Sequence, residues 1–113
     1  MKKIETVKSS LIFNDIINHG NKVATPYFII CSAKNNKEDK NLFGVAVGTK
    51  VGNAVTRNKL KRQIRRIIDN NKLLFQKNMI YIIIGKKECL KAKFDDMDKI
   101  MREALLKGEK NEK

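Results

Sequence analysis

The sequence predicts an α+β fold, a single-domain α-β sandwich with the element order helix–strand–strand–helix–strand–helix. Its 113 residues suit one domain with one modest core. Hydrophobic residues make up 42% of the chain, enough for a packed interior, and no internal repeat divides it. Apolar runs rich in β-branched residues alternate with stretches of helical period, which is typical of mixed α and β structure. We therefore expect residues 1–113 to form one domain.

The first expected helix begins after Ser9 or Ser10, either of which can accept a hydrogen bond as its N-cap. It ends at Gly20, because glycine adopts positive φ at little cost just past a helix end. Apolar residues one turn apart give this helix a wide apolar face: Ile12 with Ile16, and Phe13 with Ile17.

Three strands are expected. Residues 27–33 and 43–47 form the first two, and the polar stretch 34–41 between them suggests an antiparallel hairpin with a long flexible loop. The run 79–84 (MIYIII) is apolar throughout, as in a central strand that is buried on both faces. Because a helix lies between the second and third strands, the order also predicts a strand–helix–strand unit.

The helix between these strands carries the clearest functional signal. Residues 57–66 (RNKLKRQIRR) contain six positive charges and no negative charge, directly behind the glycine-containing turn 48–53. Asn53 is a good N-cap candidate. At 100° per residue, one side is apolar and the other basic: Leu60, Ile64, Ile67 and Ile68 oppose Lys59, Lys61, Arg62, Arg65 and Arg66.

An ordinary solvated helix face is usually balanced by glutamates four residues from its lysines, and none is present here. Asn58 lies among the cations, and Lys50 projects from the preceding turn beside the start of the helix. Gly44, Gly48 and Gly52 allow close backbone approach, but no Gly-Lys-Ser/Thr follows, which disfavours a nucleotide-binding P-loop. The pattern favours a surface that binds nucleic-acid phosphates.

The overall charge agrees with this interpretation. The formal net charge is +13, with a sequence pI near 9.9, and such a field attracts phosphate polymers. No apolar run approaches the ~20 residues that span a bilayer, and no signal-peptide pattern follows Met1. Cys31 and Cys89 are far apart and lack metal-ligand spacing, which is typical of reduced structural cysteines. We expect a cytoplasmic protein.

The last expected helix covers residues 95–106, and residues 107–113 are expected to form a flexible tail. Asp95, Asp96, Asp98 and Glu103 are a possible magnesium site, but acidic residues in a first helical turn more often stabilise the helix dipole. His19 is best interpreted as a capping residue at a helix end. No pair of carboxylates, Cys–His or Ser–His arrangement suggests an independent nuclease, so we expect no catalytic or metal-ligating side chain.

The run Val51–Arg65 (VGNAVTRNKLKRQIR) resembles the signature of the bacterial ribonuclease P protein subunit. The first helix with its His19-Gly20 end, the two strands after it, Tyr81–Ile84 and the closing helix also agree with that family. The resemblance implies a protein that assists a catalytic RNA in removing the 5′ leader of precursor tRNA, a magnesium-dependent phosphodiester hydrolysis. It also implies a left-handed β-α-β crossover, which is rare in general.

Two sets of residues match functional positions of the family. The contacts with the catalytic RNA match the basic helix and its turn: Lys50, Asn53, Arg57, Asn58, Lys59, Lys61, Arg62 and Arg65, with Arg66 on the same face. The leader-binding cleft matches Phe13, Ile17, Ile29, Cys31, Ile84 and Lys86. Ile17 and Cys31 replace common aromatic residues and Thr49 replaces a frequent lysine, which implies weaker stacking on leader bases.

The resemblance assigns the magnesium mainly to the RNA subunit and the substrate, and it implies the catalytic RNA and the precursor tRNA as partners, with no membrane and no obligate protein partner. Two alternatives stay open on the residues alone. One is a ribosomal-type or RNA-chaperone protein that uses the same basic helix without supporting catalysis. The other is a ribonuclease that needs no RNA subunit.

Overall fold

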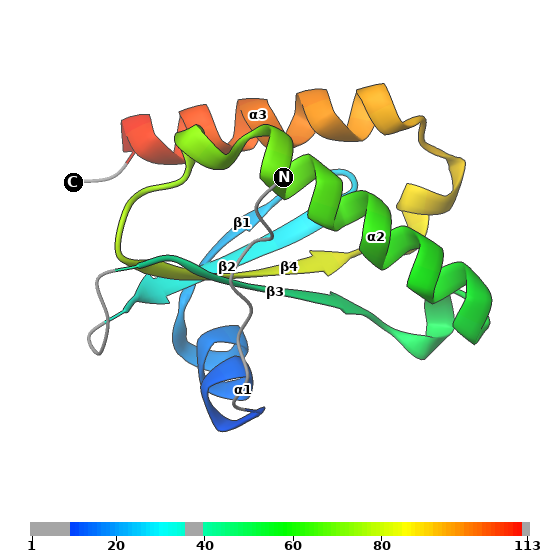
Figure 1. Ribbon diagram of the computed structural model, residues 1–113, viewed down its shortest axis with the longest axis horizontal. Coiled ribbons are helices and arrows are strands. Elements are labelled where there is room, and N and C mark those ends of the chain that lie inside the picture. Colours follow the sequence, from blue (N-terminus) through cyan, green and yellow to red (C-terminus); the bar gives the residue numbers. More distant parts are fainter. Residues whose placement is uncertain (1–9, 36–39, 112–113) are drawn as a thin grey trace.

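The computed structural model describes residues 10–35 and 40–111, with side chains described for 11–35 and 40–106. These residues form one compact domain of three α-helices and a four-stranded sheet (Figure 1). The elements are α1 (Ser10–His19), β1 (Asn21–Ala24), β2 (Phe28–Lys34), β3 (Leu42–Val47), α2 (Ala54–Asn70), β4 (Met79–Gly85) and α3 (Phe94–Asn111), with short 3₁₀ turns η1 (Thr49–Val51), η2 (Lys72–Leu74) and η3 (Lys87–Lys91).

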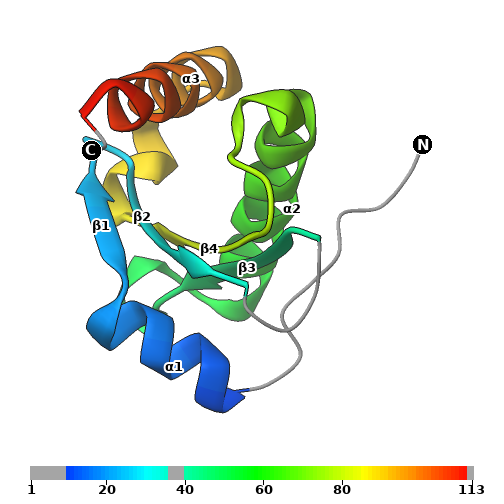
Figure 2. The same cartoon turned by 90° about the vertical axis from the view of Figure 1, so that its left-hand side faces the viewer.

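The sheet separates two layers of helix. Its strand order is β1-β2-β4-β3. Helix α1 covers one face, and α2 and α3 lie side by side on the other (Figures 1 and 2). The larger core fills the space under α2 and α3, where Ile64, Ile67, Ile83 and Met101 are fully buried. A smaller core, with Ile16 and Ile82 at its centre, lies under α1. The predicted α-β sandwich is therefore confirmed.

Strand β4 is central, as its uninterrupted apolar sequence predicts. It pairs antiparallel with β2 and parallel with β3, and all but one of its residues are buried. The predicted hairpin between β2 and β3 is therefore wrong, because β4 lies between them. The two ends of their connection bond to the chain at the start of β4: Asn35 N donates to Asn78 O (2.8 Å), and Met79 N donates to Asn41 Oδ1 (2.9 Å).

The predicted strand–helix–strand unit is β3-α2-β4. In Figure 2, which looks along the strands from their starting end, β3 runs away from the viewer, α2 returns above the sheet, and β4 runs away again to the left of β3. Seen from this side, the chain passes from β3 up to α2 and then down to β4 on the left, which is an anticlockwise path. The crossover is therefore left-handed, as the family resemblance implies. Nearly all such connections are right-handed, so the strand pattern alone gives no hint of it.

Three further expectations need correction. Strand β1 was not predicted, because its sequence, NKVA, is short and mostly polar; it pairs with β2 at the sheet edge. Helix α3 continues to Asn111, so 107–111 is helical rather than a tail, and residues 112 and 113 lie outside the described residues. Gly20 does end α1, but not through positive φ. A Cβ there would lie 2.7 Å from both Ile16 O and Ser32 O, so close packing requires the glycine.

Candidate nucleic-acid interface

Local hydrogen bonds fix the start of α2. Asn53 has extended backbone geometry, and its Oδ1 accepts from Thr56 N at 2.9 Å, which confirms it as the N-cap. Arg57 N donates to Asn53 O (2.9 Å), the first hydrogen bond of the helix ladder. The predicted apolar stripe is buried against the sheet and α3: Leu60, Ile64, Ile67 and Ile68 are each at most 3% exposed. The opposite side of α2 is therefore held rigidly toward solvent.

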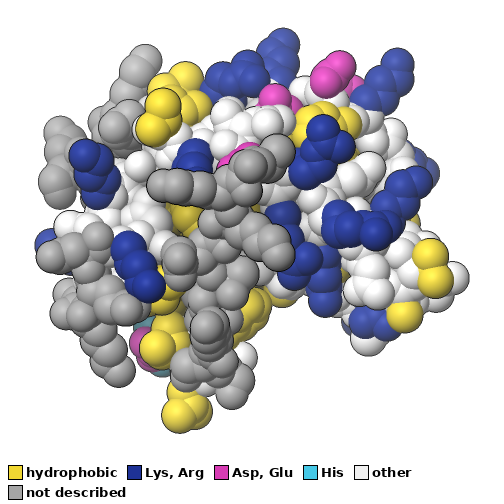
Figure 3. Space-filling model, in the orientation of Figure 1, with side chains coloured by type: hydrophobic (Ala, Val, Ile, Leu, Met, Phe, Trp, Pro, Cys, Tyr) yellow, Lys and Arg dark blue, Asp and Glu magenta, His cyan; other side chains and the backbone are white. Residues whose placement is uncertain are grey.

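The predicted RNA-contact residues lie on this solvent side, and we call the set the basic face: Lys50, Asn53, Arg57, Asn58, Lys59, Lys61, Arg62, Arg65 and Arg66. All are exposed except Arg57 and Lys61, which are half-buried. Figure 3 shows lysine and arginine side chains gathered over the α2 region of the molecule. The structure thus places the whole predicted set on one helix and the turn that leads into it.

Two arginines of the basic face have partners within the protein. Arg57 Nε donates to Gly52 O (3.1 Å), which ties this arginine to the turn before the helix. The guanidinium of Arg66 lies over the ring of Phe94, 5.5 Å from its centroid, so it also contacts α3. Both contacts fix the direction of a guanidinium group while leaving N–H groups available for phosphate.

No carboxylate among the described residues forms an ion pair with the basic face. Among the described residues, the ion pairs are Lys72 with Asp69 and Arg102 with Asp98, and both lie outside residues 50–66. Like charges one turn apart on a helix repel each other. Because no described carboxylate pairs with these cations, a polyanion bound along α2 would relieve the repulsion.

The glycines before α2 differ in what they do. A Cβ on Gly44 would lie 2.8 Å from side-chain atoms of Phe13 and Ile82, so the expected close approach occurs at β3. A Cβ on Gly52 would lie 3.0 Å from the Thr56 side chain. Gly48 has no heavy atom within 4 Å of that position, so close approach is not its role.

The second predicted set lies on the other face of the sheet. Phe13 and Ile17 of α1 lie over the sheet with Ile29 of β2 and Ile84 of β4, and all four side chains are half-buried. We call these four residues the apolar strip. Cys31 is fully buried, so it supports the strip from below rather than forming its surface. Lys86 follows β4, and its Nζ donates to Thr25 O at 2.8 Å, which holds its ammonium beside the loop before β2.

Of the remaining candidates, Asp98 and Cys89 have structural partners. Asp98 accepts from Asn71 and pairs with Arg102, and the described residues contain no group of three His, Cys, Asp or Glu side chains placed to hold a metal ion. Both cysteines are free and buried, as expected. Burial raises the pKa of Cys31. It also raises the pKa of Cys89 to about 11, and the Cys89 thiol donates to Tyr27 O (3.0 Å). Both thiols are therefore protonated and unreactive at neutral pH.

Sequence reasoning missed a pocket that lies beside the basic face, between α2 and η3. Its lining combines residues about 30 positions apart, such as Lys59 and Cys89, so no local pattern indicates it. Within the described part of the chain, none of the helices has the length and apolar character needed to cross a bilayer.

The chain is similar to proteins of one family along nearly its whole length. The family model for ribonuclease P matches residues 1–109. The ribonuclease P protein component of Mesoplasma florum is 36% identical over 110 residues, covering 95% of this chain and 97% of the relative. That of Mycoplasma capricolum is 35% identical, covering 89% and 93%. The solved structure of the Staphylococcus aureus RNase P protein is 26% identical, with a TM-score of 0.82, covering 94% of this chain and 96% of that one.

Proposed function

Because this chain belongs to the ribonuclease P protein family, and so is the protein component of a tRNA-processing endoribonuclease, we propose that its basic face binds the catalytic RNA subunit. The observation that carries the proposal is the rigid row of exposed cations along α2, none of which forms an ion pair with a described carboxylate. An arginine guanidinium group can donate two parallel N–H hydrogen bonds to a phosphate, and the positive field of the whole chain steers RNA toward this surface.

The positive charge also suggests what the protein adds to an RNA enzyme. Catalytic RNA and precursor tRNA are both polyanions, so they repel each other unless cations intervene. A small protein of net charge +13 lowers that repulsion and, with it, the concentration of magnesium that the reaction needs. The chemistry itself belongs to the RNA subunit in this proposal.

The apolar strip is our proposed contact for the 5′ leader of precursor tRNA. Phe13 is its one aromatic member and offers a π-face on which a base can stack. Ile17, Ile29 and Ile84 offer apolar contact area without such a face. Lys86 lies nearby with an ammonium group held in place, suitable for a backbone phosphate. Because stacking depends on a single ring, leader binding should be modest.

Magnesium enters this proposal as an ion held mainly by the RNA subunit and the substrate. Hard divalent cations prefer several oxygen ligands. The described acidic residues of α3 do not converge into such a set, since Asp98 is engaged with Asn71 and Arg102. The protein then acts through phosphate contacts, as one domain in the cytoplasm, with the catalytic RNA and precursor tRNA as its partners.

Reconstitution tests the proposal. Purified protein, the catalytic RNA subunit encoded by the same genome, and both together are incubated with precursor tRNA at low magnesium, and the mature 5′ end is mapped. We expect cleavage at low magnesium only with both components. Cleavage by the protein alone would identify a self-sufficient ribonuclease. RNA binding without any gain in cleavage would identify a ribosomal-type or RNA-chaperone protein.

A further inference from the structure

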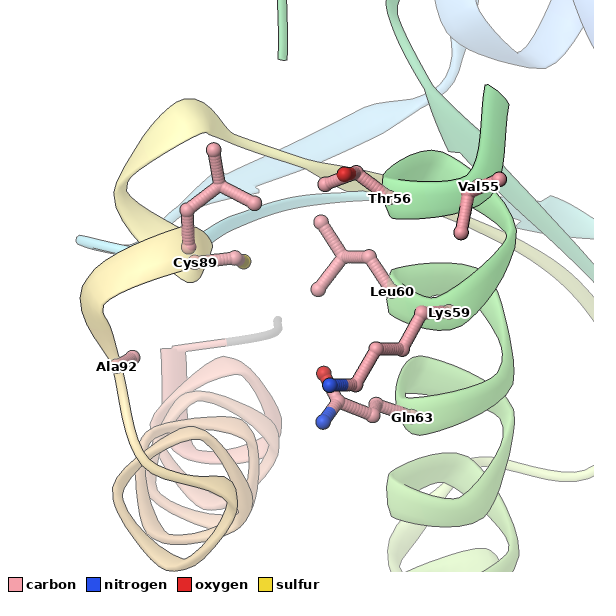
Figure 4. Close-up of a pocket in the computed structure, with 8 residues that line it drawn as sticks. Val55, Thr56, Lys59, Leu60, Gln63, Cys89 and Ala92 are labelled. Atoms are coloured by element: carbon pink, nitrogen blue, oxygen red, sulfur yellow. The ribbon is translucent and has the colours of Figure 1, made fainter. Parts of the chain in front are cut away.

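The pocket beside the basic face has a volume of about 480 Å³ and opens to solvent. In Figure 4, the side chains of Thr56, Leu60 and Gln63 reach from α2 toward η3, where Cys89 faces them across the hollow. The volume lies in the usual range for pockets that hold small ligands. The full lining is Val55, Thr56, Lys59, Leu60, Gln63, Cys89, Leu90 and Ala92.

Exposed apolar side chains gather at this pocket. Val55 is 78% exposed and Leu90 is 46% exposed, and they line the pocket from opposite sides, one on α2 and the other on η3. Of the five large hydrophobic side chains exposed in the described part of the chain, these two belong to one hollow. Exposed apolar side chains next to a formed pocket are typical of a binding site rather than of ordinary surface.

The charge around the pocket favours an anionic polymer. Lys59 of the basic face is one of the lining residues, and no carboxylate lines the pocket. Glu88 lies in η3 but is not part of the lining. A ligand that places an uncharged ring in the hollow and a phosphate near Lys59 would satisfy both parts of the site. A nucleotide within an RNA chain has this composition.

We propose that the pocket receives one unstacked nucleobase of the catalytic RNA, an inference that rests on the proposed function. Apolar walls from Leu60, Leu90 and Ala92 surround the ring, and Lys59 meets the adjoining phosphate. The amide of Gln63 carries a donor and an acceptor side by side, a pattern that matches the N6 and N7 edge of adenine. The basic face then binds the RNA backbone, and the pocket fixes its register along α2.

Charge-neutral substitutions separate the pocket from the basic face. Leu90→Ser and Gln63→Leu should each raise the dissociation constant for the catalytic RNA about tenfold. The first removes an apolar wall around the base, and the second removes the hydrogen bonds to its edge. Leu73→Ser is the matched control, since Leu73 is 98% exposed on η2 and does not line the pocket. Thermal melts of all three variants confirm that each is folded.

One result of this comparison would overturn the inference. Unchanged RNA affinity in Leu90→Ser and Gln63→Leu means that RNA does not fill the pocket, which leaves it to an apolar side chain of a protein partner. If a double variant of exposed α2 arginines loses affinity at the same time, the proposed function stands and only the pocket assignment fails.

A direct probe uses the unmodified protein and does not depend on variants that fold. The methyl NMR signals of Val55, Leu60 and Leu90 are followed as adenosine monophosphate is added, and again with inorganic phosphate at equal concentration. We expect shifts at these methyls with the nucleotide alone. Equal shifts with both ligands, or none with either, would contradict a base in the pocket.

Discussion

The arginines of α2 differ in how firmly the protein holds them. Arg57 is half-buried and bonded to Gly52 O, and Arg66 lies over Phe94, so replacing either one also removes a contact within the fold. Arg62 and Arg65 are exposed and have no such contact among the described residues. These two are therefore the residues whose removal reports on RNA binding alone.

Phe13 is the residue on which leader recognition depends in our proposal. We predict that Phe13→Ala weakens binding of leader-bearing precursor tRNA by the holoenzyme by about 1–3 kcal/mol, the usual range for one base–aromatic stack, and leaves leaderless tRNA nearly unaffected. The ratio of the two dissociation constants is the measurement, because a loss of protein stability affects both alike.

Ile17→Ala is the matched control for Phe13→Ala. It truncates a half-buried side chain of the same helix that has no π-face, so the ratio should change much less. An equal loss of affinity for both tRNAs in Phe13→Ala would show that Phe13 only packs α1 on the sheet.

Gly44 places the ring of Phe13 close to the sheet. We predict that Gly44→Ala destabilises the fold by about 1–3 kcal/mol, because the new Cβ would lie 2.8 Å from atoms of Phe13 and Ile82, and both must move. Gly48→Ala should be neutral or slightly stabilising, since its surroundings are open and its φ of −70° suits any residue. Urea unfolding measures the stability of both variants. Equal unfolding midpoints for Gly44→Ala and Gly48→Ala would contradict close packing at Gly44.

Among the elements, α2 is held to α3 by one polar network. Asn71 is 5% exposed, and its amide donates to Ile67 O (2.9 Å) at the end of α2 and to Asp98 of α3. Arg102 completes the network by pairing with Asp98 and donating to Asn71 Oδ1 (3.4 Å). The direction in which α2 presents its cations therefore depends on contacts at its far end.

We predict that Asn71→Ala lowers the free energy of unfolding by about 2 kcal/mol, because the buried Ile67 carbonyl and the half-buried Asp98 carboxylate each lose one hydrogen bond. Asn70→Ala, one residue earlier and exposed, should change it by less than about 0.5 kcal/mol. Denaturant unfolding followed by circular dichroism measures both. Similar losses in the two variants would mean that the network contributes little.

The elements that sequence predicts well are those with strong local signals. The apolar stripe of α2, its Asn53 cap and the uninterrupted run of β4 each carry their structure in neighbouring residues, and all three are confirmed. The strand order could not be predicted this way. A polar connection after 27–33 fits a hairpin as well as a path around β4, and only the pairing of β4 with both neighbours decides.

The candidate site likewise has one part that local sequence predicts and one part that it does not. Its basic face is contiguous in sequence, so the charge run indicated it directly. The apolar strip joins α1, β2 and β4, and its members were named only through the family resemblance. Nothing local distinguishes the half-buried Ile29 from the fully buried Cys31 two positions along the same strand, because the position of α1 over the sheet determines their exposure.

The whole molecule carries a charge that makes RNA binding sensitive to salt. Five cations of the basic face are exposed: Lys50, Lys59, Arg62, Arg65 and Arg66. With a slope of about −0.7 to −0.9 per phosphate contact, we predict that affinity for the catalytic RNA falls about a hundredfold or more between about 50 and 200 mM salt. A nearly flat salt titration would count against a phosphate interface.

The most direct test of the central claim compares two pairs of lost charges. Arg62→Ala with Arg65→Ala removes two exposed cations of the basic face, and Lys77→Ala with Lys99→Ala removes two exposed cations elsewhere. Both double variants lower the net charge equally, so the dissociation constant for the catalytic RNA isolates the effect of position. We predict a loss of at least about tenfold for the arginine pair and a much smaller loss for the lysine pair, with native circular dichroism in both. Equal losses would mean that the chain binds RNA by its overall charge, with no role for the basic face of α2.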